Sequence, residues 1–87
     1  MEFTEKSFEM RAVRREEIIN YFIKIGGNEK EDGTFAGEGW ETEIGQETTV
    51  YLGSFILPEI KITIRARKDL FDKLYSDFNM VFLHAGG

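Results

Sequence analysis

The chain has 87 residues and a formal net charge of −5; it is 41% apolar, 31% charged and contains no cysteine. This length predicts one domain, residues 1–87, with one core and no deep enzyme cleft, and the lack of cysteine excludes disulfides and thiolate metal sites. The acidity argues against nucleic-acid binding. No apolar run reaches the roughly 18 residues of a membrane span, so we expect a cytoplasmic protein.

The first two predicted elements are a weak strand and a clear helix. Residues 1–12 alternate weakly between apolar and polar side chains, which predicts either a short edge strand or a loose arm. Residues 14–25 predict a helix, because Ile18, Phe22 and Ile25 recur at helical spacing and form an apolar stripe. Two glycines follow, and they are a typical end of a helix.

Residues 40–44 and 48–52 predict a β-hairpin, and its register depends on the length of the connecting loop. With a three-residue loop, Gly45-Gln46-Glu47, Ile44 pairs with Thr48 and the apolar residues share one face of the hairpin. A two-residue loop would place apolar residues opposite glutamates. We therefore predict the three-residue loop.

A further strand is predicted from about Glu59 to Arg67, where apolar residues alternate with lysine, threonine and arginine. This alternation is typical of a half-buried strand with a cationic solvent face. Pro58 is the only proline, and it cannot donate a ladder hydrogen bond. We therefore expect a turn or bulge between residues 54–57 and this strand.

A second helix is predicted to begin at Asp69 as its N-cap and to end near Asn79, with apolar residues at three- and four-residue spacing between them. Residues 80–84 form either a last strand, which the run Val81-Phe82-Leu83 favours, or an extension of this helix; we predict the strand. The order is then roughly α-β-β-β-α-β, with an N-terminal edge strand as a possible addition. It predicts an α+β fold in which two helices pack on one face of an antiparallel β-sheet.

The stretch from Gly26 to Glu47 holds six of the nine glycines, and its seven acids and one base sum to −6. Calcium binds six to eight oxygens supplied by a backbone that curls around the ion. We therefore predict that the acidic, glycine-rich loop 28–41 binds Ca²⁺ or another divalent cation weakly. The candidate ligands are four carboxylates of this loop: Glu29, Glu31, Asp32 and Glu38.

This loop does not follow the pattern of an EF-hand. With the obligatory glycine of that motif placed on Gly33, Lys30 falls at position 3 and Gly39 falls at position 12, where a glutamate is required. Any calcium site here would therefore be irregular and exposed. The structural alternative is an acidic hairpin tip that is only solvated, in a domain with no ligand.

Three segments resemble a small uncharacterised α+β protein of methanogenic archaea that is described as binding calcium through acidic residues. They are the helix RREEIINYFIKIGG (14–27), the loop NEKEDGTFAGEGWE (28–41) and the strand EIKITIRAR (59–67). The resemblance implies an antiparallel sheet covered by two helices, a thermophilic cytosolic source and no assigned enzymatic activity. It supports the calcium interpretation and implies no individual ligands.

The chain ends His84-Ala85-Gly86-Gly87, and this diglycine resembles the tail of the ubiquitin-like sulfur carriers of the molybdopterin and thiamine pathways. Those small acidic proteins are activated at the terminal carboxylate as an acyl-adenylate, and glycines allow such a tail to enter a narrow partner channel. Their fold, however, begins with a strand hairpin before the main helix. The alternative function is a protein-interaction or sulfur-carrier-like module that uses Gly86-Gly87, and the structural alternative is a frayed terminus.

Two basic clusters could hold phosphate or nucleic acid, but no aromatic residue is interleaved on the predicted strand for base stacking. We expect these side chains to face solvent or to pair with the acids of residues 41–47. No catalytic pattern accompanies His84, the only histidine, so we predict a non-enzymatic protein. The clusters comprise Arg11, Arg14 and Arg15, and Lys61, Arg65, Arg67 and Lys68.

Overall fold

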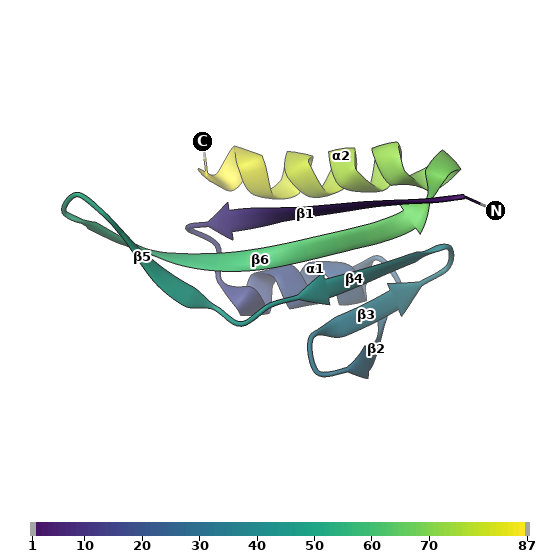
Figure 1. Cartoon of the computed structure of the whole chain (residues 1–87), viewed down its shortest axis with the longest axis horizontal. Helices are drawn as coiled ribbons and strands as arrows, with labels where there is room; N and C mark the ends of the chain where they lie inside the picture. The colour runs from purple at the N-terminus through teal and green to yellow at the C-terminus, as the bar shows by residue number, and fades with distance from the viewer. Residues whose placement is uncertain (1, 87) are drawn as a thin grey trace.

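The computed structural model describes residues 2–86, and the surroundings of side chains as far as Phe82. Figure 1 shows an antiparallel sheet with two helices, which confirms the predicted α+β class. The chain begins with a strand and ends with a helix, however, so the predicted order α-β-β-β-α-β is wrong. The elements are β1 (Phe3–Arg11), α1 (Arg15–Lys24), β2 (Asn28–Glu31), β3 (Thr34–Gly37), β4 (Trp40–Ile44), β5 (Thr48–Leu52), β6 (Phe55–Arg67) and α2 (Lys68–Gly86).

The sheet is built around β6, its longest strand. The strand order is β1-β6-β4-β3-β2, with β5 paired to β6 beyond the end of β4. β1 pairs with β6 from Phe3 opposite Arg67 to Arg11 opposite Glu59, so the segment predicted as an edge strand or a loose arm is an edge strand. All the strand pairs are antiparallel.

The predicted hairpin between residues 40–44 and 48–52 is wrong, because β4 and β5 do not pair with each other. Both pair with β6, where Ile44 lies opposite Ile62 and Thr48 lies opposite Glu59. The chain reverses later, at a two-residue turn that begins with Gly53, whose φ is +62°. Alternation of apolar residues fixes which face of a strand is buried, but it does not identify the partner strand.

Pro58 lies inside β6, so the predicted turn or bulge before residue 59 is also wrong. The carbonyl oxygen of Pro58 accepts a hydrogen bond from the Ala12 N–H at 3.0 Å, on the side of β6 that faces β1. In an antiparallel strand the nitrogen of a residue points to the same side as its oxygen. The proline nitrogen therefore points past the end of β1, where no ladder hydrogen bond is lost.

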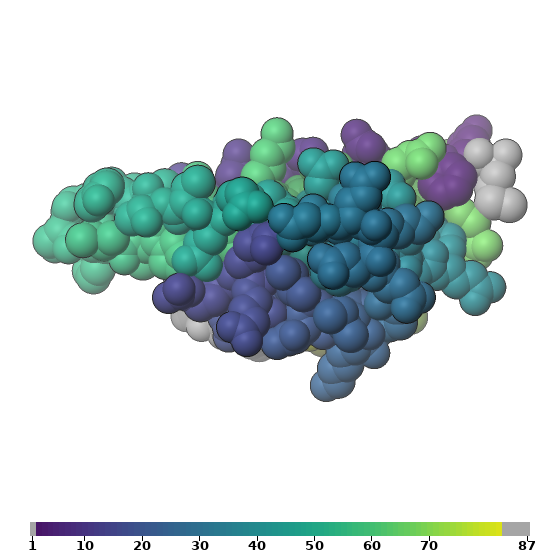
Figure 2. All heavy atoms as spheres, turned by 90° about the horizontal axis from the view of Figure 1, so that it is seen from below, coloured from purple at the N-terminus to yellow at the C-terminus, as the bar shows by residue number. Residues whose placement is uncertain are grey.

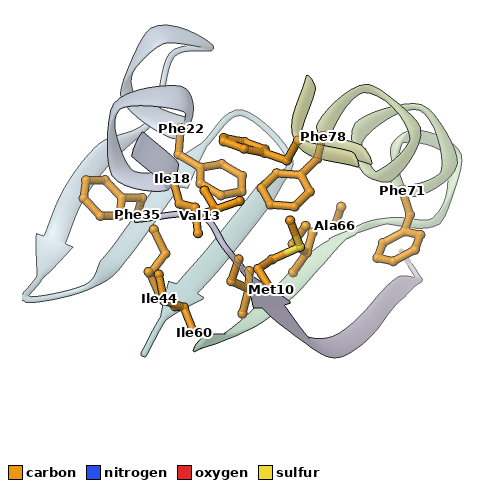
Figure 3. Packing of buried hydrophobic residues seen from close by; sticks show 13 residues of the cluster. Met10, Val13, Ile18, Phe22, Phe35, Ile44, Ile60, Ala66, Phe71 and Phe78 are labelled. Carbon is orange, nitrogen blue, oxygen red and sulfur yellow. The ribbon is translucent and has the colours of Figure 1, made fainter. Parts of the chain in front are cut away.

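Both helices lie on one face of the sheet, as predicted, and they meet each other above it (Figure 3). The rings of Phe22 in α1 and Phe78 in α2 stack with their centroids 5.6 Å apart. Beneath them the apolar side chains of residues 60–66 of β6 are fully buried, and they alternate with half-buried and exposed polar residues, as the pattern of residues 59–67 predicts. These core residues are Ile60, Ile62, Ile64 and Ala66.

The predicted last strand at residues 80–84 does not form, because α2 continues to Gly86. Phe82 is buried four residues after Phe78, so helical spacing continues past Asn79 and overrides the β-propensity of the Val81-Phe82-Leu83 run. Asp69 lies in the first turn of α2 rather than at its N-cap. Within residues 2–86, neither helix combines the length and the apolar character needed to cross a membrane.

Candidate functional site

The acidic stretch that the sequence singles out is not one loop. Residues 28–37 form the strands β2 and β3, joined by a tight turn at Asp32 and Gly33. Glu29 and Glu31 lie on β2, whose four residues are all exposed. Glu38 lies in the next turn, between β3 and β4. The predicted flexible loop is therefore a pair of short edge strands.

This geometry separates the four predicted calcium ligands. Asp32 and Glu38 flank opposite ends of β3, whose four residues span about 13 Å. Calcium–oxygen distances are about 2.3–2.6 Å, so these two carboxylates cannot bind one ion together. Glu29 and Glu31 share β2 with a register irregularity between them. The structure does not bring the four carboxylates into one site.

Asp32 pairs with a basic side chain of the protein itself. A guanidinium nitrogen of Arg15 lies 3.9 Å from the Asp32 carboxylate. Across the part of the chain that the structure describes, no three acidic or histidine side chains are grouped so that they could hold a metal ion. The calcium interpretation of residues 28–41 therefore gains no support from the structure.

The glycines of this stretch have structural roles of their own. A Cβ atom on Gly37 would overlap the indole ring of Trp40, which packs over that residue and against Phe22 at a centroid distance of 5.6 Å. Gly33 has a φ of +85°, a conformation that other residues rarely adopt, in the turn between β2 and β3. Trp40 is half-buried and packs against the hydrophobic core.

The carboxylate of Glu47 accepts hydrogen bonds at the N-terminus of α1. The sequence alone places this residue only in the predicted loop 45–47. Its Oε1 accepts hydrogen bonds from the backbone N–H of Arg15 at 3.0 Å and from Nε of Arg14 at 3.3 Å. The Glu17 carboxylate accepts the N–H of Arg14 in the same turn at 3.0 Å. Two internal carboxylates therefore already occupy the position where a helix N-terminus would receive an external anion. The sequence holds no motif that joins Glu47 to this helix.

The basic residues are largely engaged with the protein's own acids and rings. Arg11 pairs with Glu59 at 2.7 Å, and Arg67 and Lys68 pair with Asp69 and Glu2. The Arg65 guanidinium lies 4.4 Å from the ring centroid of Phe3, and Arg65 is the cross-strand neighbour of Glu41. The expected pairing of the basic clusters with the acids of residues 41–47 is confirmed at Arg14, whose Nε lies 3.3 Å from the Glu47 carboxylate.

Three open hollows of about 440, 240 and 240 Å³ lie on the surface of the described residues. The largest lies over the N-terminus of α1, between Arg14, Ile19 and Glu47. The tyrosines with shifted pKa values lie elsewhere. Burial raises the pKa of Tyr21, and the charge of Asp77 raises it further. The pKa of Tyr75 is lowered by a hydrogen bond with Asn79 and by Lys6, although burial acts in the opposite direction. None of the hollows combines a shifted group with a nucleophile or a metal ligand.

Comparison with known families bears on both resemblances. The sequence profile of a family described as archaeal MoaD-like protein matches residues 6–87. The chain belongs to the archaeal MoaD-like family. The match supports the archaeal affiliation expected from the sequence, but it carries no support for calcium binding. A search of curated proteins found no match to this MoaD-like chain.

The topology of this MoaD-like protein departs from the element order expected of a ubiquitin-like carrier. A single strand, β1, precedes α1, and its partner is β6 rather than a neighbour in a strand hairpin. α2 extends to Gly86, so the first glycine of the diglycine lies at the end of a helix. Gly87 and the side chain of His84 lie outside the described part of the chain.

Proposed function

We propose that this MoaD-like chain is a sulfur-carrier-like protein-interaction module and not an enzyme. A partner enzyme would recognise its surface and activate the carboxylate that follows Gly86-Gly87. The observation that carries the proposal is the family match, which spans residues 6–87 and therefore includes both glycines. The net charge of −5 would favour a partner whose docking surface is basic.

The reaction that we propose is an adenylation of the carboxylate. One of its oxygens attacks the α-phosphorus of ATP, a new P–O bond forms, and pyrophosphate leaves with the electrons of the bond that breaks. The product is an acyl-adenylate whose carbonyl can be attacked by a sulfur nucleophile. This chain supplies the reacting carboxylate, and the partner supplies ATP binding and catalysis.

The helical end of α2 affects how the Gly86-Gly87 tail would enter the channel of a partner. A partner channel that admits a glycine tail requires an extended backbone, whereas α2 runs to Gly86. Glycine is about 1 kcal/mol less favourable than alanine inside a helix, so the last turn is the part of α2 that unwinds at the lowest free energy. We expect the tail to leave the helix when the partner binds.

Incubation with ATP and an archaeal activating enzyme for sulfur carriers tests the proposal. The expected result is release of pyrophosphate and an intact-protein mass increased by one adenylyl group. The matched control replaces Gly86 and Gly87 by alanines; this variant keeps the carboxylate and the chain length but fills the narrow channel, and it should react much more slowly. A folded wild-type chain that forms no adenylate with such enzymes, or reacts no faster than the alanine variant, would contradict the proposal.

A further inference from the structure

A hairpin arm of residues 48–58 extends beyond the body of the molecule. It consists of β5 and the first four residues of β6, and Figures 1 and 2 show it projecting at the left, past the ends of both helices. Large apolar side chains are exposed along the arm: Tyr51 by 72%, Leu52 by 43%, Phe55 by 69% and Ile56 by 66%. A two-stranded hairpin is at best marginally stable alone in water, so this arm is a segment that needs a covering surface.

The composition of the arm differs from that of the rest of the chain. Residues 48–58 include no acidic, basic or histidine residue, although 31% of the whole chain is charged. Natural proteins protect exposed strand edges with charged side chains, and lysine is the commonest of these. The arm lacks this protection, which points to pairing of its edge with another strand.

The register shows which edge of the arm is open. Thr49 lies opposite Pro58, and the backbone of Pro58 faces the β1 side of β6, so Thr49 and Pro58 do not exchange hydrogen bonds. The N–H and C=O groups of Thr49, and of Tyr51 two residues later, therefore point away from β6. No other described strand pairs with β5. On the opposite edge of the arm, Pro58 has no N–H to donate.

We propose that the arm binds the arm of a second copy of this chain, with the β5 strands antiparallel across a two-fold axis. The absence of charged side chains along the arm suits this occupant. Two chains of charge −5 repel wherever their bodies meet, but the arm brings no charge to the contact. The five residues of β5 are about 17 Å long, which is about twice the 8 Å screening length at physiological ionic strength. The bodies of the two copies therefore stay largely screened from each other.

The side chains also suit a two-fold contact. Antiparallel pairing about Val50 would set Tyr51 of each copy beside Thr49 of the other, and Leu52 beside Thr48. Every such pair is uncharged, and an aromatic–β-branched pair such as Tyr51 with Thr49 is favourable across strands. The joined arms form a four-stranded sheet, in which the outward N–H and C=O groups of Thr49 and Tyr51 find partners.

Sedimentation equilibrium of the full chain over a range of concentrations tests this proposal. The wild type should form a species of twice the 10.1 kDa chain mass. Tyr51→Lys places two like charges beside the two-fold axis and should weaken self-association at least about tenfold. Thr49→Pro removes an outward N–H without breaking a bond to β6 and should weaken it similarly. The matched control is Met80→Lys, a comparably exposed residue on α2, 63% accessible, which should dimerise as the wild type does.

A wild type that stays monomeric at every concentration would overturn the proposal. So would variants at Tyr51 and Thr49 that remain folded by circular dichroism and dimerise as tightly as the wild type. Equal weakening by Met80→Lys would also overturn it, because the contact would then not be confined to the arm. This inference does not depend on the proposed carrier function, since adenylation of the tail needs only one chain.

Discussion

The two halves of β6 have similar apolar side chains in very different surroundings. Ile56 and Ile60 point to the same face of one strand, four residues apart, yet Ile56 is 66% exposed and Ile60 is fully buried. The difference lies in the helices, because α1 and α2 cover the sheet over the body and do not extend over the arm (Figure 1). The alternation of apolar residues indicates which face of a strand is suited to burial. Whether that face is buried depends on how far α1 and α2 extend over it.

We expect the largest effect on stability when one isoleucine in each half of β6 is shortened to alanine. We expect Ile62→Ala to lower the free energy of unfolding by about 2–5 kcal/mol, because the fully buried side chain would leave a cavity under the helices. We expect Ile56→Ala to change it by less than about 0.5 kcal/mol in dilute, monomeric protein. Urea denaturation of both variants measures the contrast, and equal losses would show that the arm is as firmly packed as the body.

A second substitution tests how tightly the body packs at its far edge. Gly37→Ala should destabilise the protein by about 1–3 kcal/mol, because the new Cβ would push the indole ring of Trp40 away from Phe22. Removing the indole first, with Trp40→Leu, should make the same glycine substitution much less harmful. A double-mutant cycle by urea denaturation measures this coupling, and fully additive effects would contradict the contact.

A smaller effect is expected at the joint between body and arm. Glu47 lies where β4 gives way to β5, and Glu47→Ala should lower stability by about 1 kcal/mol, because the N–H of Arg15 loses its acceptor. Glu43→Ala, which removes an exposed carboxylate from β4, is the control and should have little effect. Thermal denaturation compares the two, and similar losses from both would rule out a special role for Glu47.

The smallest effect concerns two tyrosines of the helical layer. Burial and Asp77 raise the pKa of Tyr21 above 10.0, so its contribution to stability is present below pH 10.0 and is lost as pH rises through the folded-state pKa. The pKa of Tyr75 is lowered by Asn79 and Lys6, so its contribution has the opposite sign and grows as pH rises. Phenolate absorbance should therefore show Tyr75 ionising before Tyr21, and Tyr21→Phe should reduce the alkaline loss of stability; the reverse order of ionisation would contradict both assignments.

The parts of the fold that could be predicted are those that local periodicity determines. The spacing of Ile18 and Phe22 predicted α1, and the alternation from Ile60 to Ala66 predicted the buried half of β6, because both patterns report a single face. The partner of β4 could not be predicted, since Ile44 fits opposite Thr48 or Ile62 equally well. The end of α2 was missed because helical burial of Phe82 outweighed its strand propensity.

The candidate site was harder to predict than the fold. Composition placed Asp32 and Glu38 in one acidic stretch, but two short strands hold them at opposite ends of β3. Glycines that were interpreted as flexible ligand-loop residues are required for turns and for the approach of Trp40. The exposure of Tyr51 and Ile56 depends on where two helices end, a property that no local pattern within residues 48–58 carries.

The place of Pro58 in β6 has a consequence for how far association can proceed. Open strand edges on both sides of an arm would let copies add without limit, as in the growth of a fibril. On the β6 edge of the arm, Pro58 offers no N–H and its C=O is already bonded to Ala12, so only Ile56 is open there. The β5 edge presents both Thr49 and Tyr51, and two such edges satisfy each other. The one proline of the chain thus makes a closed pair, rather than an extending polymer, the expected end of assembly.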